Sequence, residues 1–250
     1  MQYTCSMKNL ITARELYRIL IFNYRIKSLA GKINFQLGDI SVAIKRRDVI
    51  GDIMQKWVEE CLKRSRIDFL ANPKVQMPPD IFLDPENLRR DWLEIKAFNR
   101  EKSPKFSIAD FNFFIKELIK RPWHLEADYL IFGYILNKET GFLYIQDIWL
   151  KKIWEITATT SKRPLTVHIK KGVIREIRPC KWYSDKNSIK VFECLEDFLS
   201  AFIETLYENS ETHDYAPKWR KKFIQSYKKH YEKEIYIPNW KDIKEKYEKI

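Results

Sequence analysis

The stretch MPPDIFLDPENLRRDWLEIKAFN, residues 77–99, decides the fold of this chain. Two short apolar runs, at about 80–84 and 91–98, lie on either side of a charged break. The break contains Pro85 and Asn87, which are residues typical of turns. The pattern therefore predicts two strands joined by a turn, and a turn of this kind places the two strands side by side.

Ionisable side chains lie within these two predicted strands. Asp80 begins the first, and Glu94 and Lys96 lie in the second, 94 − 80 = 14 residues further on. Because side chains alternate along a strand, Glu94 and Lys96 share one face and Ile95 points to the other. Buried charges are costly unless they are paired or bind a metal. The pattern predicts either a salt-bridged hairpin or a metal site formed by Asp80, Glu94 and the backbone carbonyl of Ile95.

The metal alternative suits one kind of chemistry in particular. Cleavage of a phosphodiester requires an activated water, neutralisation of the scissile phosphate and support for the leaving oxygen. Carboxylates that hold Mg²⁺ supply these functions, and Mg²⁺ is usually bound by one or two carboxylates together with phosphate and water. A second acid-x-lysine sequence, Asp242-Ile243-Lys244, lies in a polar tail and lacks a preceding proline-aspartate. We therefore place the candidate site at residues 80–96.

The composition limits the classes of protein to which this chain can belong. The chain has 250 residues, of which 45% are hydrophobic and 14% aromatic, and this is enough for a sizeable core. No apolar run approaches the roughly 18 residues of a membrane span, and the N-terminal residues lack the order of a secretory signal. We expect a cytoplasmic protein with no membrane partner. Four scattered cysteines without CxxC spacing disfavour a zinc site or a disulfide framework.

The charge and the missing motifs narrow the function further. The net charge is +12, from 46 Lys and Arg against 34 Asp and Glu. Such an excess favours a polyanionic partner, although a lysine-rich composition inherited from an AT-rich genome explains it as well. The six glycines form no GxGxxG or P-loop motif, and the sequence has no HxxxH or GxSxG motif. The chemistry therefore depends on carboxylates and lysines.

The remaining pattern alternates helices and strands. Thr12, Asp48 and Ser107 are predicted to cap three helices, the second and third of which cover about 49–64 and 107–120. Further predicted elements are hairpins at 33–37 with 40–44, at 127–136 with 141–150 and at 165–177, and late helices at 193–208 and 218–233. This order predicts an α/β fold with a mixed central β-sheet flanked by helices, additional hairpins and C-terminal helices.

The central stretch resembles a known superfamily. Pro79-Asp80 followed by Glu94-Ile95-Lys96 is similar to the motif of the PD-(D/E)xK nucleases. The longer stretches around it resemble type II restriction endonucleases, specifically the NgoBV/NlaIV-like family. This resemblance covers about 30–205, and it implies a PD-(D/E)xK restriction-endonuclease-like core. We expect a single nuclease domain over 1–250, with a C-terminal helical tail at about 206–250.

The resemblance also implies roles for individual residues. Carried over by position, Asp80 and Glu94 bind Mg²⁺, and Lys96 positions or activates the attacking water. Members of the superfamily often add an acidic residue from a preceding helix. Glu59 and Glu60 are the candidates in this chain, and a helical wheel favours Glu60, which flanks the apolar face, over Glu59, which lies nearer to the solvent side.

The implied activity is that of a type II restriction endonuclease. Such an enzyme hydrolyses phosphodiester bonds in unmethylated double-stranded DNA in a sequence-specific, Mg²⁺-dependent reaction, and the family implies a GGNNCC-type site. A palindromic site favours a homodimer, and the activity implies pairing with a cognate DNA methyltransferase. Two alternatives stay open. The chain could be a structure-specific repair or recombination nuclease with the same catalytic trio, or a non-catalytic DNA-binding module.

Polar residues that follow the second strand are candidates for DNA contacts. Asn99, Arg100 and Lys102 lie directly after the predicted strand, and Arg163 belongs to a second basic group further along the chain. Arginine pairs favourably with guanine and asparagine with adenine, and all four side chains can also bind phosphate. A solvated loop explains each of these residues equally well.

Overall fold

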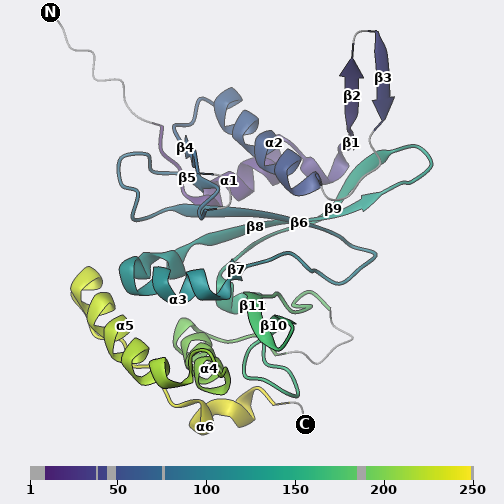
Figure 1. Ribbon diagram of the computed structural model, residues 1–250. Helices are drawn as coiled ribbons and strands as arrows, with labels where there is room; N and C mark the ends of the chain where they lie inside the picture. Colours follow the sequence, from purple (N-terminus) through teal and green to yellow (C-terminus); the bar gives the residue numbers. More distant parts are fainter. Residues whose placement is uncertain (1–8, 38, 44–48, 75–76, 185–189, 249–250) are drawn as a thin grey trace, which may run out of the picture. The chain divides into compact units, whose positions relative to one another are not determined.

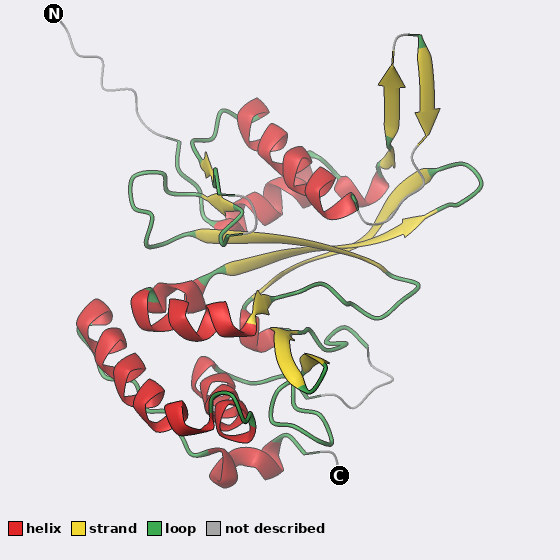
Figure 2. Cartoon of the chain, viewed as in Figure 1, coloured by secondary structure: helices red, strands yellow, loops and turns green. Residues whose placement is uncertain are grey.

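The structure, a computed structural model, describes residues 9–37, 39–43, 49–74, 77–184 and 190–248 (Figure 1). It consists of two compact units. The first, which we call the sheet unit, comprises Met1–Lys102 and Glu126–Lys151, and the second, the helical unit, comprises Ser103–Leu125 and Lys152–Ile250. Each contains both helices and strands (Figure 2). Within the described ranges no helix is both long enough and apolar enough to cross a membrane.

The sheet unit is built on a six-stranded sheet with the strand order β1-β9-β8-β6-β5-β4. Its strands are β1 (Ala30–Lys32), β4 (Leu70–Ala71), β5 (Ile81–Phe82), β6 (Trp92–Asn99), β8 (Asp128–Leu136) and β9 (Phe142–Lys151). Strands β6 and β8 run parallel, whereas the other neighbouring pairs are antiparallel. The predicted mixed α/β fold is therefore confirmed. A separate antiparallel hairpin, β2 (Asn34–Leu37) with β3 (Ile40–Ala43), also agrees with the prediction.

Two helices provide the core on one face of this sheet (Figure 1). Helix α1 (Ala13–Arg18) begins at the predicted capping box, in which Glu15 N donates to Thr12 Oγ1 at 3.2 Å and Thr12 N donates to Glu15 Oε2 at 2.7 Å. A π-helical turn at Ile19–Asn23 and a 3-10 turn at Ile26–Ser28 follow. Helix α2 spans Ile50–Arg64, and its predicted cap, Asp48, lies outside the described residues.

The core under these helices shows why β6 is fixed in place. Leu93 and Ile95 of β6 pack in one cluster with residues of both helices and of the neighbouring strands. The fully buried members of that cluster include Leu20, Val58, Leu62, Ile81, Leu130 and Phe132. Because alternate residues of β6 are committed to this core, the side chains between them must point to the opposite face of the sheet.

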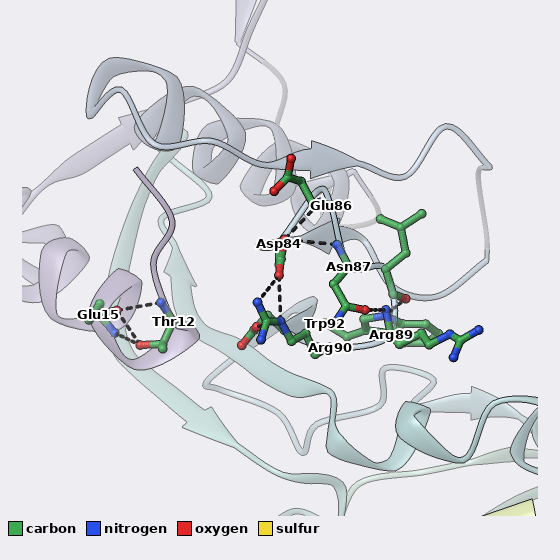
Figure 3. A network of polar contacts seen from close by, with 10 residues as sticks. Thr12, Glu15, Asp84, Glu86, Asn87, Arg89, Arg90 and Trp92 are labelled. Atoms are coloured by element: carbon green, nitrogen blue, oxygen red, sulfur yellow. Dashed lines mark hydrogen bonds and ion pairs between the residues drawn. The ribbon is translucent and has the colours of Figure 1, made fainter. Parts of the chain in front are cut away.

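A polar network orders the loop that joins β5 to β6 (Figure 3). Asp84 is only 3% exposed, and its carboxylate accepts hydrogen bonds from the backbone N–H groups of Glu86 and Asn87 at 3.0 and 3.2 Å. The same carboxylate pairs with Arg90 at 2.6 Å. Trp92 closes the loop by donating from Nε1 to the carbonyl of Leu88 at 2.9 Å. The loop is therefore a rigid connection that sets the register of the hairpin.

Removing this carboxylate is expected to destabilise the protein. Asp84→Ala leaves two backbone donors and Arg90 without their charged acceptor, and hydrogen bonds to charged groups contribute roughly 1.5–3 kcal/mol each. We expect the free energy of unfolding to fall by about 2–3 kcal/mol, measured by urea denaturation. Leu88→Ala is the matched control, because Trp92 binds only the backbone carbonyl of Leu88, whose side chain is 44% exposed, and this variant is expected to remain within about 0.5 kcal/mol of the wild type.

The helical unit combines a small sheet with four α-helices. The sheet has the order β10-β11-β7, with β7 at Ala109–Asp110, β10 at Val167–Lys170 and β11 at Val173–Ile177. The helices are α3 (Phe111–Lys120), α4 (Leu195–Glu208), α5 (Ala216–Tyr231) and α6 (Trp240–Ile243). Short 3-10 turns lie at Pro122–Glu126, Ile153–Glu155, His213–Tyr215 and Lys244–Lys246. The predicted hairpin turn is confirmed, since Lys171 and Gly172 have φ values of 53° and 78°, as a two-residue hairpin turn requires.

One predicted cap in this unit is wrong. Helix α3 begins at Phe111, and its N-cap is Asp110, whose Oδ1 accepts from Phe113 N at 2.8 Å. The residues after Ser107 cannot enter a helix because they pair with β11. Ile108 N donates to the carbonyl of Ile177 at 3.0 Å, and β7 continues this pairing. The long-range pairing therefore delays the start of the helix by several residues.

Candidate active site

The structure brings Asp80, Glu94 and Lys96 together. Glu94 and Lys96 lie on one face of β6, and Lys96 Nζ is 2.7 Å from Glu94 Oε2. Ile95 points to the opposite face, into the core beneath α2. Asp80 precedes β5, which is antiparallel to β6, and its Oδ2 accepts a hydrogen bond from the backbone N–H of Ile95 at 2.6 Å. The predicted alternation and the predicted hairpin are both confirmed.

The electrostatics of this cluster follow from its burial. Glu94 is 4% exposed, and burial raises its pKa to about 7, although the nearby Lys96 ammonium opposes the shift and Asp80 adds to it. Burial also raises the pKa of Asp80, against the effects of Lys96 and of the Ile95 N–H. Burial disfavours the Lys96 ammonium, but the Glu94 and Asp80 carboxylates outweigh this effect and raise its pKa. Two carboxylates therefore share one lysine, which leaves the ionised cluster one negative charge in excess.

The donor set fits a divalent cation. Glu94 Oε1 is buried and has no hydrogen-bond partner among the described residues. One of the two oxygens of the Glu94 carboxylate therefore still requires a ligand. Across those same residues no group of three or more His, Cys, Asp or Glu side chains could hold a metal. Mg²⁺ does not require such a group, because one or two carboxylates with water and phosphate suffice. Asp80, Glu94 and the Ile95 carbonyl are hard oxygen donors that suit this ion.

Helix α2 buries Glu59 and exposes Glu60, the reverse of what the helical wheel indicated. Glu59 is 6% exposed and pairs with Lys56 at 2.9 Å, and the charges of Asp52 and, to a lesser extent, Glu59 add to the rise in the pKa of Asp80. Glu60 is exposed and pairs with Arg64 at 2.9 Å. The wheel misplaced the two residues because it ranked positions by the apolar residues alone, whereas Glu59 is among the buried residues of α2. Which of the two acids joins a metal site stays a prediction.

This difference gives a testable expectation. Glu59→Gln removes a negative charge near Asp80, so the attraction of the site for a cation weakens. We expect cleavage at limiting Mg²⁺ to fall several-fold, with little change at saturating Mg²⁺. The measurement is a titration of cleavage rate against Mg²⁺ concentration. Glu60→Gln should give a curve that overlays that of the wild type, and equal effects of the two variants would remove Glu59 from the site.

The predicted DNA-contacting residues lie in two different places. Asn99 is buried, and its Oδ1 accepts from Glu101 N at 2.8 Å, so it orders the turn after β6. Lys102 lies exposed in the same segment. Arg100 pairs with Asp147 at 2.6 Å. Arg163 belongs to the helical unit, where it lies 4.0 Å from Glu208.

A mixed α/β fold that places a carboxylate and a lysine on one central strand, with a second carboxylate beside them at the start of the neighbouring strand, is typical of a nuclease. Comparison with known proteins agrees. Residues 10–247 match the NgoBV restriction endonuclease family. The chain is 44% identical to the type II restriction enzyme NlaIV of Neisseria lactamica, over 96% of this chain and 98% of that enzyme. It is 39% identical to the type II restriction enzyme NgoBV of Neisseria gonorrhoeae, over 59% of this chain and 83% of that enzyme.

A solved structure extends the comparison to the fold. The NlaIV restriction endonuclease superimposes with a TM-score of 0.90 at 44% identity, covering 96% of this chain and 98% of that one. The chain therefore belongs to the NgoBV restriction endonuclease family. It is a type II restriction enzyme, that is, a site-specific deoxyribonuclease, and its substrate is DNA.

Proposed function

We propose that the enzyme uses Mg²⁺ to hydrolyse phosphodiester bonds of unmethylated double-stranded DNA at a GGNNCC-type site. The observation that supports this most directly is the cluster of the buried Glu94 with the half-buried Asp80 and Lys96, in which one Glu94 oxygen lacks a partner among the described residues. The site of cleavage rests on the resemblance to the NgoBV/NlaIV-like family. The core is then of the PD-(D/E)xK type, within a single nuclease domain.

Each residue of the cluster has a distinct part in this reaction. Asp80 and Glu94 would hold the cation, with the Ile95 carbonyl as a further oxygen donor, and the hydrogen bond from Ile95 N fixes the Asp80 carboxylate in position. When bound, Mg²⁺ polarises the phosphate and lowers the pKa of a bound water. Lys96 is held 2.7 Å from Glu94, so its ammonium would lie beside a phosphate bound at the cation and would orient the attacking water.

The same proposal includes the partners of the enzyme. A homodimer presents one reading surface to each half of a palindromic site, which a single chain cannot do. Host DNA must be protected from such an activity, so the enzyme is paired with a cognate DNA methyltransferase and acts in the cytoplasm, where host and invading DNA are found. The net charge of +12 supports association with DNA.

The test is digestion of two linear duplexes, one with a single GGNNCC site and one in which a guanine of that site is replaced. We expect two fragments from the first duplex only, and only when Mg²⁺ is present. Cleavage of branched DNA with no cleavage of either linear duplex would instead establish a structure-specific nuclease. Binding of both duplexes without cleavage of any substrate would indicate a DNA-binding module.

A further inference from the structure

The β10–β11 hairpin of the helical unit presents three cationic side chains to solvent (Figure 1). Lys170 is the last residue of β10, Lys171 lies in the turn, and Arg175 lies in β11. All three are exposed. Within the part of the chain that the structure describes, none of the three side chains takes part in an ion pair or a hydrogen bond. Their charges are therefore available to a ligand that comes from outside the chain.

The carboxylates near the hairpin already have partners. Glu176 of β11 pairs with Arg178 and lies 3.2 Å from His168 Nδ1. Asp110 of the neighbouring strand β7 caps α3, because its Oδ1 accepts from Phe113 N at 2.8 Å. Over β7, the hairpin and Arg178, the sequence places four Lys and Arg residues against these two acids. The surface of the hairpin therefore carries a net positive charge.

The turn itself is poorly suited to a lysine. Lys171 has a φ of 53°, in the left-handed region that glycine, asparagine and aspartate adopt most readily in two-residue hairpin turns. A lysine in this conformation costs stability. A Cβ atom added at Gly172 would meet no atom of the described chain within 4 Å, so the tip of the hairpin is open to a ligand. Turn chemistry does not account for Lys171, whereas a role for its charged side chain does.

A β-bulge changes the position of the third cation. The register of β10 with β11 shifts between His168 and Ile169, so Arg175 is an extra residue on β11 without an opposite residue. Bulges of this kind alter the direction of a side chain and often lie at functional sites. Arg175 is exposed, while Ile174 and Ile177 on the same strand are 2% and 0% exposed. The apolar residues of β11 thus anchor the hairpin, and its cations remain outside.

We propose that the β10–β11 hairpin binds the phosphate backbone of the DNA substrate through Lys170, Lys171 and Arg175. Duplex DNA carries one negative charge per about 1.7 Å of its axis, and cations that neutralise phosphates supply affinity without reading sequence. Two of the three cations are lysines, which bind phosphate as point charges, whereas base reading favours an arginine in a fixed orientation. The proposal rests on DNA as the substrate and not on the cation or the cleavage site.

The test measures binding to a cognate and a non-cognate duplex at several salt concentrations, without Mg²⁺ so that neither duplex is cut. Lys171→Asn should raise the melting temperature by roughly 1–3 °C, because asparagine suits the turn better. The same variant should lower the affinity for both duplexes several-fold. The slope of log K against log salt concentration should become shallower by about 0.9, the value for one lost phosphate contact. A lysine that is only part of the turn would give the first effect without the others.

Further variants separate the hairpin from net charge. Lys170→Gln and Arg175→Gln should each reduce the slope by about the same amount as Lys171→Asn, and the triple variant by about three times as much. Lys116→Gln is the matched control, because Lys116 is an exposed lysine on α3 of the same unit. This control loses the same charge and should keep the slope and the affinity of the wild type.

Three results would overturn the proposal. Lys171→Asn could raise the melting temperature and leave DNA binding unchanged, in which case the hairpin is only solvated. The hairpin variants could weaken binding of the cognate duplex alone, which is the behaviour of base contacts. Lys116→Gln could reduce the slope as much as they do, so that only net charge matters. A wild type that binds DNA but cuts neither duplex when Mg²⁺ is added would refute the proposed function and leave this test intact.

Discussion

Glu94→Gln is expected to abolish DNA cleavage while the enzyme still folds and binds DNA. The amide keeps the shape of the side chain but removes the negative charge that binds the cation, so the rate should fall by at least roughly 10³-fold. The measurement is single-turnover cleavage of a cognate duplex at saturating Mg²⁺. In parallel, Mg²⁺ should raise the melting temperature of the wild type, because it binds the folded state only, and it should leave that of the variant unchanged.

The stability of this variant provides an independent readout. The pKa of Glu94 is raised from 4.5 to about 7 by burial, so the native state holds a proton that the unfolded chain releases. The free energy of unfolding therefore falls as the pH rises from 4.5 to about 7, because the native state must give up the proton of Glu94. Above pH 7 the ionised Glu94 carboxylate destabilises the native state. Without metal at pH 8, Glu94→Gln should melt at a higher temperature than the wild type. A lower melting temperature together with full cleavage would exclude Glu94 from the metal site.

Lys96→Met is expected to inactivate the enzyme by a different route. Methionine retains much of the apolar stem, but it cannot orient the attacking water or stabilise charge on the phosphate, so cleavage should fall by roughly 10²–10⁴-fold. Lys96→Met should strengthen Mg²⁺ binding, whereas Glu94→Gln should weaken it. Lys96 is 2.7 Å from Glu94 and competes with a cation for that carboxylate. Its removal should therefore strengthen Mg²⁺ binding several-fold, measured by calorimetry.

The control for this variant is the lysine in the second acid-x-lysine sequence. Lys244 lies in the C-terminal segment of the helical unit, where it begins a 3-10 turn. Lys244→Met should cleave at the rate of the wild type. If Lys96→Met retains cleavage, or if it loses Mg²⁺ binding together with cleavage, then Lys96 does not have the separate role proposed for it.

Much of the site could be predicted because it depends on local geometry. Glu94 and Lys96 share a face since they are two residues apart in a strand, and a hairpin brings Asp80 beside them. The capping box at Thr12 and the turn at Lys171 are equally local, and both are confirmed. These features depend on residue spacing and turn chemistry, which a single sequence displays directly.

The features that sequence reasoning missed depend on contacts between distant segments. Ser107 was predicted as the cap in place of Asp110 without Asp110 being considered, because the pairing of β7 with β11 is not visible locally. Glu59 was ranked below Glu60 because the position of β5 relative to α2 is a tertiary property. Asp147 stands 47 residues after Arg100, and no motif connects them. The nearest sequence signal was Gly133, a lone glycine within an apolar strand, against which the Arg100 side chain packs.

The single uninterrupted strand β6 has an evolutionary consequence. Glu94 and Lys96 lie on it, and Arg100 follows directly after its end at Asn99. An insertion of one residue between Lys96 and Arg100 would turn the arginine into the hydrophobic interior, and an insertion of two would move it by about 7 Å. The distance of this segment from the catalytic residues therefore cannot change by one residue without turning its side chains to the other face of the sheet.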